Sequence, residues 1–392
     1  MDTKSAVRET VEKYRAKLVG LSHLIHANPE LGFEEEKSSR WISEFLTDAG
    51  FAVDSGICEM PTAFVARAGS GPLHIAICAE YDCLPGIGHA CGHNIIAAMA
   101  AGAAIGAARV ADELGLTISV IGTPAEEIGD ASGKILLLER GAFEGVHAAM
   151  MTHPAPLDMA EPPIIAIATF DVHYTGKEAH ASAFPEAGIN AADALTVAQT
   201  AIGLLRQHIG HDDRVHGIIT HGGEAPNIVP AHTSARYMVR AKTLKELEHI
   251  RSRVMNCFEA GALATGSKLE VRGGSKPYAE MIHDHGLAAL YRHNAEQLGR
   301  TFLSIPGMDR AAGSTDMGNI SLALPSIHPM IGINSLPAIN HQPEFTAHCI
   351  SADADGAVFD GALAMAWTIS DAAIDQQSRQ RLLARQKRLP VT

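Results

Sequence analysis

The chain has 392 residues, 46% of them hydrophobic, which is enough for two or three domains of ordinary size. The formal net charge is −13 and no basic patch stands out, so we expect no binding to nucleic acid. No apolar run approaches ~20 residues, the N-terminus does not resemble a signal peptide, and the six cysteines lack disulfide spacing, so we expect a cytoplasmic protein that does not contact membranes.

The first strongly patterned elements are a strand and a helix with a polar loop between them. Residues 73–78 form an apolar run typical of a buried strand, and residues 95–105 are typical of a packed helix. α/β sheets place their ligands on such strand-to-helix loops, and a thiolate beside an imidazole can bind a borderline-soft divalent metal. The loop carries Glu80, Asp82, His89, Cys91 and His93.

Three later strand ends carry similar side chains. Glu126 and Glu127 follow the next apolar strand, His153 ends another, and His341 follows a later one. Taken singly, these are a solvated glutamate pair and ordinary loop histidines, and Cys91 is an ordinary core cysteine. Together they favour a site for two metals, because the candidate ligands exceed the three or four that one Zn²⁺ needs. The candidates are Cys91, His93, Glu127, His153 and His341.

The middle of the chain has a different pattern. Residues 166–276 read as strand, helix, strand, strand, helix and strand, which is the order of a ferredoxin-like α+β unit. Residues 277–392 return to the alternating helices and strands of residues 1–165. We therefore expect one catalytic domain, formed by 1–165 and 277–392, that is interrupted by an inserted domain at 166–276.

Short motifs along nearly the whole chain resemble the M20 family of metallopeptidases and aminoacylases. The chain is most similar to the amidohydrolase branch, which includes aminobenzoyl-glutamate hydrolase and the auxin-conjugate hydrolases. Asn94 stands where many of these amidohydrolases have Asp, and together with residues 80–89 it makes the chain more similar to β-alanyl-lysine dipeptidase-like proteins. The matching segments are 24–34, 88–93, 124–127, 151–154, 176–182, 227–230, 313–316 and His341.

The resemblance implies an α/β catalytic domain with a mixed central sheet and two divalent metal ions per subunit, Zn²⁺ or Mn²⁺. It implies that the inserted domain is a lid that also forms a homodimer. It further implies that Cys91 bridges the two metals, with His93 and His153 on one and Glu127 and His341 on the other. The residues alone indicate only that all five are ligands.

Four further residues lie beside these candidate ligands in the sequence. Glu126 fits a general base and acid, a role that the resemblance also implies, and the alternative is a ligand role shared with Glu127. Asp82 is expected behind a ligating histidine, which it would orient. Glu80 stands where other M20 branches have a ligand histidine, and we expect it not to bind metal. His89 is expected to be a packing residue.

The resemblance also implies residues that face the substrate. His180 matches a histidine that reaches across the dimer to hydrogen-bond the oxyanion of a tetrahedral intermediate. Asn227 matches a lid residue that contacts substrate, and Arg310 matches an arginine that binds the substrate carboxylate in glutamate carboxypeptidases. Without the resemblance, His180 reads as a surface histidine in a turn and Arg310 as a surface arginine.

These features predict an enzyme that hydrolyses the amide bond of N-acyl amino acids or small dipeptides. We expect small substrates because a closing lid limits the space above the site. The alternative enzyme is a hydrolytic deaminase that acts on a small amine at the same metals. A metal-binding protein without catalysis would require the loss of Glu126 or of a ligand, and none of these residues is missing.

Overall fold

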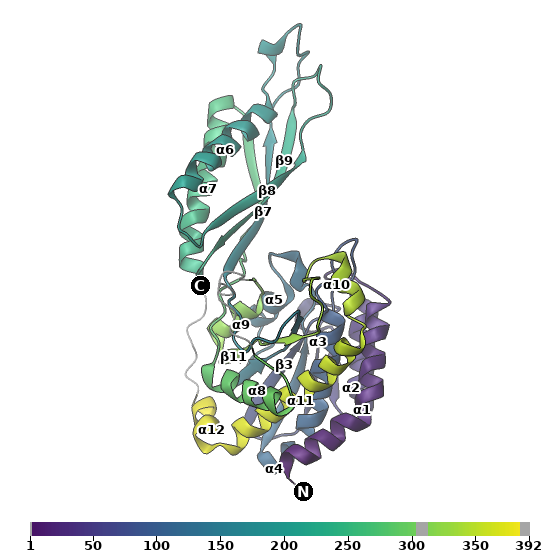
Figure 1. Ribbon diagram of the computed structural model, residues 1–392. Coiled ribbons are helices and arrows are strands. Elements are labelled where there is room, and N and C mark those ends of the chain that lie inside the picture. The colour runs from purple at the N-terminus through teal and green to yellow at the C-terminus, as the bar shows by residue number, and fades with distance from the viewer. Residues whose placement is uncertain (1, 303–312, 385–392) are drawn as a thin grey trace. The chain divides into compact units, whose positions relative to one another are not determined.

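The computed structural model describes residues 2–302 and 313–384. The chain forms two compact units (Figure 1). Unit 1 comprises residues 1–128, 132–163 and 281–392, and unit 2 comprises residues 129–131 and 164–280. Residues 277–280 belong with unit 2 because Tyr278 pairs with Ile167 and the backbone N–H of Leu244 donates to Glu280.

The central sheet of unit 1 is mixed, as the sequence predicts. Its strand order is β1-β2-β4-β3-β5-β11. Strands β3, β4, β5 and β11 run parallel to one another, while β1 and β2 are antiparallel at one edge. A second, two-stranded parallel sheet pairs β6 with β12. The strands are β1 (Ala52–Ser55), β2 (Phe64–Ala68), β3 (Leu73–Ala79), β4 (Leu116–Gly122), β5 (Ala148–Met150), β6 (His153–Ala155), β11 (Ser326–Ile327) and β12 (Met330–Gly332).

Helix α3 (His93–Ala108) contacts β3 and β4, and α1, α2, α4 and α11 pack against it (Figure 1). Helix α3 is rich in alanine and glycine, so α1 and α11 approach it closely. A Cβ atom at Gly102 would lie 2.8 Å from Leu18 and 2.9 Å from Ala362, so this contact requires glycine. The other helices of unit 1 are α1 (Thr3–His26), α2 (Glu36–Asp48), α4 (Ala111–Leu114), α5 (Gly133–Glu139), α8 (His285–Gln297), α9 (Met317–Ala323), α10 (Pro343–His348), α11 (Ala352–Ile374) and α12 (Gln376–Leu383), with short 3₁₀ turns at Ile57–Glu59 and Glu126–Ile128.

Helix α11 bears on the expectation that no segment spans a membrane. Among the described residues it is the one helix long and apolar enough, by length and composition, to cross one. However, 83% of its most apolar stretch is buried inside the protein. Small residues and scattered acidic residues interrupt the apolar pattern of this segment, so the length of the helix is not evident from the sequence. In the structure, the helix packs against α3, α1 and α8.

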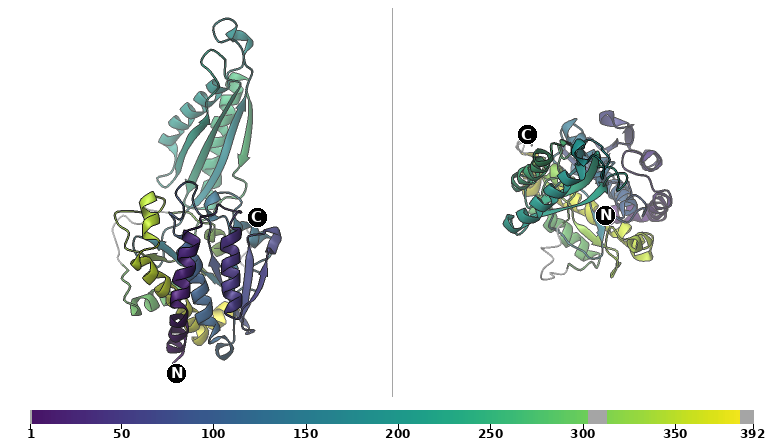
Figure 2. Two further views of the ribbon diagram at one scale, coloured as in Figure 1. Left: turned by 90° about the vertical axis from the view of Figure 1, so that its right-hand side faces the viewer. Right: turned by 90° about the horizontal axis from the view of Figure 1, so that it is seen from above.

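Unit 2 has the predicted ferredoxin-like arrangement. Its antiparallel sheet has the order β10-β7-β9-β8. Helices α6 and α7 lie against one face of this sheet (Figure 2), where Phe170, Tyr237 and Phe258 pack together. Asn190 and Thr243 cap the two helices through their side chains. The elements are β7 (Ala166–Thr175), α6 (Ala191–Leu205), β8 (Arg214–His221), β9 (His232–Ala241), α7 (Leu244–Thr265) and β10 (Lys268–Gly273), with 3₁₀ turns at Pro185–Ala187 and Arg206–His208.

Candidate metal centre

The candidate ligands of unit 1 meet where neighbouring strands end. The loop after β3 carries Cys91 and leads to His93 at the start of α3. Glu127 follows β4, and His153 begins β6 just after β5. The carboxyl ends of parallel strands lie at one edge of a sheet, so residues far apart in the sequence come together there. His341 joins them because its backbone N–H donates to the carbonyl of Ala90 at 2.9 Å.

Two histidines are oriented by their second ring nitrogen. The Nδ1 atom of His93 lies 2.9 Å from Asp82 Oδ1, and the Nδ1 atom of His153 lies 2.8 Å from the carbonyl oxygen of Pro154. Both partners accept hydrogen bonds, so each Nδ1 carries a proton, and in the neutral ring Nε2 then has a lone pair. Such an outer partner commonly fixes the tautomer of a metal-ligating histidine. Asp82 is thus in contact with the ring of a candidate ligand.

The donor atoms lie at separations that suit a metal ion. The Sγ atom of Cys91 is 3.4 Å from the Nε2 atoms of both His153 and His341. The Nε2 atom of His341 is 3.4 Å from Glu127 Oε1. Ligands around a tetrahedral Zn²⁺ stand roughly 3.3–3.7 Å apart, given metal–ligand distances of about 2.0–2.3 Å. Two sets of donors, each within 4.8 Å, share Cys91: one with His93 and His153, the other with Glu127 and His341.

Unsatisfied polar atoms support the same interpretation. His93 Nε2 and Glu127 Oε1 are buried, and neither has a hydrogen-bond partner among the described residues. Leaving such a group unpaired in the interior costs about 1–3 kcal/mol. A thiol, imidazoles and carboxylates are also the donor types that bind Zn²⁺ and its neighbours. The residues present therefore fit a divalent metal.

The electrostatics of the site favour a cation. Burial raises the pKa of the Cys91 thiol well above its ordinary value, and the charge of Glu127 adds to this. Burial likewise raises the pKa of Glu127, although His93 and His341 oppose the shift. Burial lowers the pKa of His153 to about 4, which leaves its imidazole neutral at pH 7. Metal ligation needs thiolate, carboxylate and neutral imidazole, so a bound cation would stabilise these forms.

Glu126 is buried next to these donors, with its Oε2 atom 4.0 Å from His93 Nε2. Burial, together with the charges of Glu80 and Glu127, raises its pKa well above the ordinary value. The residue before it, Ala125, has a φ of 59°, and His341 has a φ of 68°. Non-glycine residues held in this region cost of order 1–3 kcal/mol and cluster at functional sites.

Sequence reasoning missed a buried cation beside the site. The Nζ atom of Lys134 lies 2.5 Å from Glu80 Oε1 and 2.5 Å from Asp316 Oδ1, and all three side chains have no exposed surface. Burial alone would raise the pKa of Glu80, but Lys134 outweighs it and the pKa falls to about 2. The only available signal was a single lysine in the apolar run of residues 133–138.

The structure describes three of the four remaining predicted residues. His89 is buried and its ring stacks on that of His26, with centroids 6.0 Å apart. His180 and Asn227 are exposed on neighbouring segments of unit 2, joined by a hydrogen bond of 3.0 Å from the Ala181 N–H to the Asn227 carbonyl. Arg310 lies outside the described residues.

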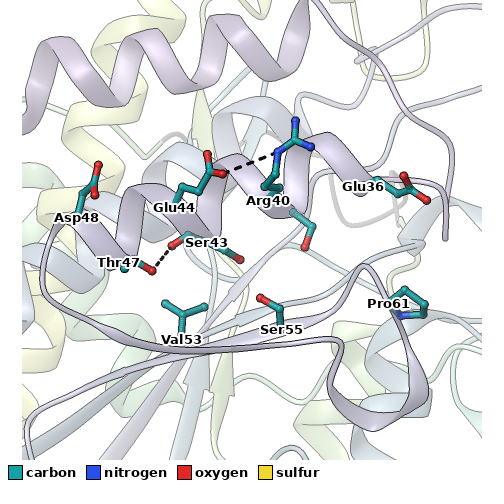
Figure 3. A pocket seen from close by; sticks show the side chains of 10 residues that line it. Glu36, Arg40, Ser43, Glu44, Thr47, Asp48, Val53, Ser55 and Pro61 are labelled. Atoms are coloured by element: carbon teal, nitrogen blue, oxygen red, sulfur yellow. Dashed lines mark hydrogen bonds and ion pairs between the residues drawn. The ribbon is translucent and has the colours of Figure 1, made fainter.

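A surface hollow of about 430 Å³ in unit 1 is separate from these donors (Figure 3). It lies between α2 and β1, where Arg40 and Glu44 form an exposed ion pair and the Thr47 hydroxyl donates to the Ser43 carbonyl. The residues that line it include none of the candidate ligands. The hollow therefore has no part in the metal centre.

Comparisons with known proteins agree with this geometry. The pattern of peptidase family M20/M25/M40 matches residues 76–355. The chain is 38% identical over 383 residues to a human (Homo sapiens) protein named Xaa-Arg dipeptidase, covering 93% of this chain and 87% of that protein. It is 33% identical over 287 residues to one of the subunits of p-aminobenzoyl-glutamate hydrolase from Escherichia coli (strain K12), covering 68% of this chain and 59% of that protein.

A solved structure shares the fold. A dinuclear metal-binding peptidase of the M20 family from Bacillus subtilis superimposes with a TM-score of 0.70 at 21% identity, covering 93% of this chain and 99% of that chain. The family pattern, the identity to the dipeptidase and the donor set therefore lead to one conclusion. The chain belongs to peptidase family M20 and is a metal-dependent amidohydrolase or peptidase.

Proposed function

We propose that the protein hydrolyses the amide bond of N-acyl amino acids or small dipeptides, with Glu126 as the group that moves the proton. The observation that carries this proposal is the position of Glu126. Its carboxylate lies beside two donor sets that share Cys91, and 4.0 Å from a histidine of one set. A proton carrier next to a metal centre is what amide hydrolysis requires.

We propose that two divalent ions, Zn²⁺ or Mn²⁺, are held by these sets. Cys91 would be shared, with His93 and His153 on one side and Glu127 and His341 on the other. When bound, such ions activate water and polarise the substrate carbonyl. The mixture of thiolate, imidazole and carboxylate donors is compatible with either ion.

Glu126 would accept a proton from the attacking water and return it to the leaving nitrogen. Its burial and the nearby charges of Glu80 and Glu127 favour holding a proton, which suits this shuttle. The competing role is metal ligation, because Glu126 also forms a donor group with Glu80 and His93. Replacement of Glu126 separates the two roles, since only a ligand would take metal with it.

The names of two relatives support the proposed substrate class. Two proteins named Xaa-Arg dipeptidase, from Homo sapiens and Mus musculus, are 38% and 36% identical to the chain. We therefore propose small dipeptides, tested first with those ending in arginine, as substrates. Asn227 and Arg310 are proposed to contact the substrate, with Arg310 binding its carboxylate.

Unit 2 is proposed to act as a lid and to form a homodimer. The Nδ1 atom of His180 accepts hydrogen bonds from the backbone N–H groups of Ser182 and Ala183 at 3.3 Å. Its proton therefore lies on Nε2, which leaves a donor for an oxyanion. β8 lies at the edge of the sheet, and its Ile218 and Ile219 are 65% and 51% exposed, which supports pairing with a second copy.

We also propose a cytoplasmic location, because all six cysteines are free thiols in the structure.

The activity is tested by incubating metal-depleted protein, with and without added Mn²⁺ or Zn²⁺, with N-acyl amino acids and Xaa-Arg dipeptides. Metal-dependent release of free amino acids supports the proposal. Release of ammonia from a small amine, with no amide hydrolysed, would instead identify a deaminase.

A further inference from the structure

A buried cluster of ion pairs, formed by Lys134, Glu80 and Asp316, lies next to the candidate metal centre. Lys134 contacts both Glu80 and Asp316 through its ammonium group, at 2.5 Å from one oxygen of each. All three side chains are fully buried, so the charges cannot be solvated by water. An ionised carboxylate persists in such a place only with a partner, and Lys134 provides one.

The two carboxylates differ in what their second oxygen does. Asp316 Oδ2 accepts hydrogen bonds from the Ser132 hydroxyl at 2.6 Å and from the backbone N–H of Lys134 at 3.1 Å. Glu80 Oε2 has no hydrogen-bond partner in the described part of the chain. Both oxygens of Asp316 therefore have hydrogen-bond partners within the cluster, whereas Glu80 Oε2 is an acceptor without a donor.

The spare oxygen of Glu80 faces a candidate metal ligand. Glu80 Oε2 lies 3.3 Å from His93 Nε2, an atom that also lacks a hydrogen-bond partner among the residues described. The Nδ1 proton of His93 points at Asp82, so in the neutral imidazole Nε2 presents a lone pair. A positive charge between Nε2 and the Glu80 oxygen, supplied by a bound cation or by a second ring proton, makes this arrangement favourable in the protein interior.

The spacing of these two atoms matches a shared metal. A nitrogen and an oxygen on one tetrahedral Zn²⁺ are roughly 3.3–3.5 Å apart, given metal–ligand distances of about 2.0–2.2 Å. Glu80 and His93 also form a donor group with Glu126, in which the ligand atoms all lie within 4.8 Å of one another.

We infer that Glu80 is a further oxygen donor to the divalent ion that His93 holds, and that Lys134 positions it. This inference rests on the metal centre of the proposed function and reverses the expectation from sequence that Glu80 does not bind metal. Lys134 compensates the charge of Glu80 through one oxygen and thereby fixes the direction of the other. Asp316 is the second carboxylate in contact with the Lys134 ammonium group.

The chain offers a matched pair of variants that tests this inference. Glu80→Gln leaves Lys134 paired with Asp316, and Asp316→Asn leaves Lys134 paired with Glu80, so both variants retain one buried ion pair. Only Glu80→Gln removes a carboxylate oxygen that faces His93. The readout is metal content and affinity of the purified full-length protein, measured by titration with Zn²⁺ and Mn²⁺ and by the visible spectrum of bound Co²⁺.

We expect Glu80→Gln to weaken binding of one metal by ~10–100-fold, the range found for losses close to a metal site, and to change the Co²⁺ spectrum. Asp316→Asn should keep the wild-type affinity and spectrum, whatever its effect on the melting temperature. If Glu80→Gln does not fold, Glu80→Asp serves instead, because it keeps a carboxylate for Lys134 while withdrawing it from His93.

Two results would overturn the inference. Wild-type affinity and spectrum in the Glu80 variant would show that its oxygen does not reach the metal. Equal loss of metal in both variants would show that the cluster acts only through the stability of the fold. Because the readout is metal binding, a wild-type protein that hydrolyses no amide would contradict the proposed function and leave this inference standing.

Discussion

The Oδ1 atom of Asp82 lies 2.9 Å from His93 Nδ1, while its Oδ2 atom accepts the backbone N–H of Glu127, also at 2.9 Å. One buried carboxylate thus fixes the ring of one candidate ligand and the backbone of another. Because His93 belongs to one donor set and Glu127 to the other, Asp82 fixes the position of the two sets relative to each other. A change at Asp82 should therefore affect both metals.

Asp82→Asn is expected to lower metal affinity by ~10–100-fold, because the amide can replace only one of the two acceptor oxygens. Isothermal titration with Zn²⁺ measures this, with the exposed Asp54→Asn as control. Unchanged affinity in Asp82→Asn would show that the orientation of His93 does not depend on this carboxylate.

Lys134→Met should destabilise the protein by about 3–5 kcal/mol, because it leaves two buried carboxylates without their cation. Denaturant unfolding of metal-saturated protein measures the change. The exposed Lys37→Met is the control and should stay within about 0.5 kcal/mol of wild type. Similar stability of the two variants would contradict the importance of the buried cluster.

The buried carboxyl group of Glu35 predicts how the stability of the folded protein depends on pH. Its Oε1 atom accepts the backbone N–H of Ala125 at 2.8 Å, and burial together with the charge of Asp82 raises its pKa from 4.5 to about 7. The folded protein therefore holds a proton that the unfolded chain releases between these values. The resulting stability is complete below about pH 4.5 and is lost as the pH rises through about 7.

Glu35→Gln should remove this dependence. From pH 4.5 to pH 8, the free energy of unfolding of wild type should fall relative to Glu35→Gln by on the order of 3 kcal/mol. Both proteins are compared at saturating metal, so that the metal contribution cancels. A difference between them that stays constant with pH would refute the shifted pKa.

Much of this arrangement could be predicted from the sequence, because the relevant signals are local. The period of the apolar residues predicts β3 and α3, and Cys91 and His93 follow from their position between these elements. The order of elements in residues 166–276 likewise predicts the ferredoxin-like unit, since each strand and helix carries its own pattern.

The residues that the sequence did not reveal depend on contacts between distant segments. Lys134 reads as the polar side of a short helix, and its burial follows only from the positions of Glu80 and Asp316, 54 and 182 residues away. Glu35 stands between two other glutamates and reads as solvated, although it alone of the three is buried. Local patterns do not encode such pairings.

The role of His180 can be tested by subunit mixing. His180→Ala should lower kcat by ~10²–10³-fold without loss of metal, as expected for one oxyanion donor. If His180 acts across a dimer, mixing it with inactive Glu126→Gln protein should restore part of the activity, because half of the sites in a mixed dimer have both residues. Demonstrated subunit exchange without recovered activity would exclude action across the dimer.

The most direct test of the account is the metal content, substrate binding and turnover of Glu126→Gln, measured on the same preparation. The account predicts that this variant keeps its metals and binds an Xaa-Arg dipeptide, yet loses turnover by ~10²–10⁴-fold or more, because the proton carrier is gone. Retention of near wild-type turnover, or loss of metal together with activity, would contradict the assignment of Glu126 as the general base.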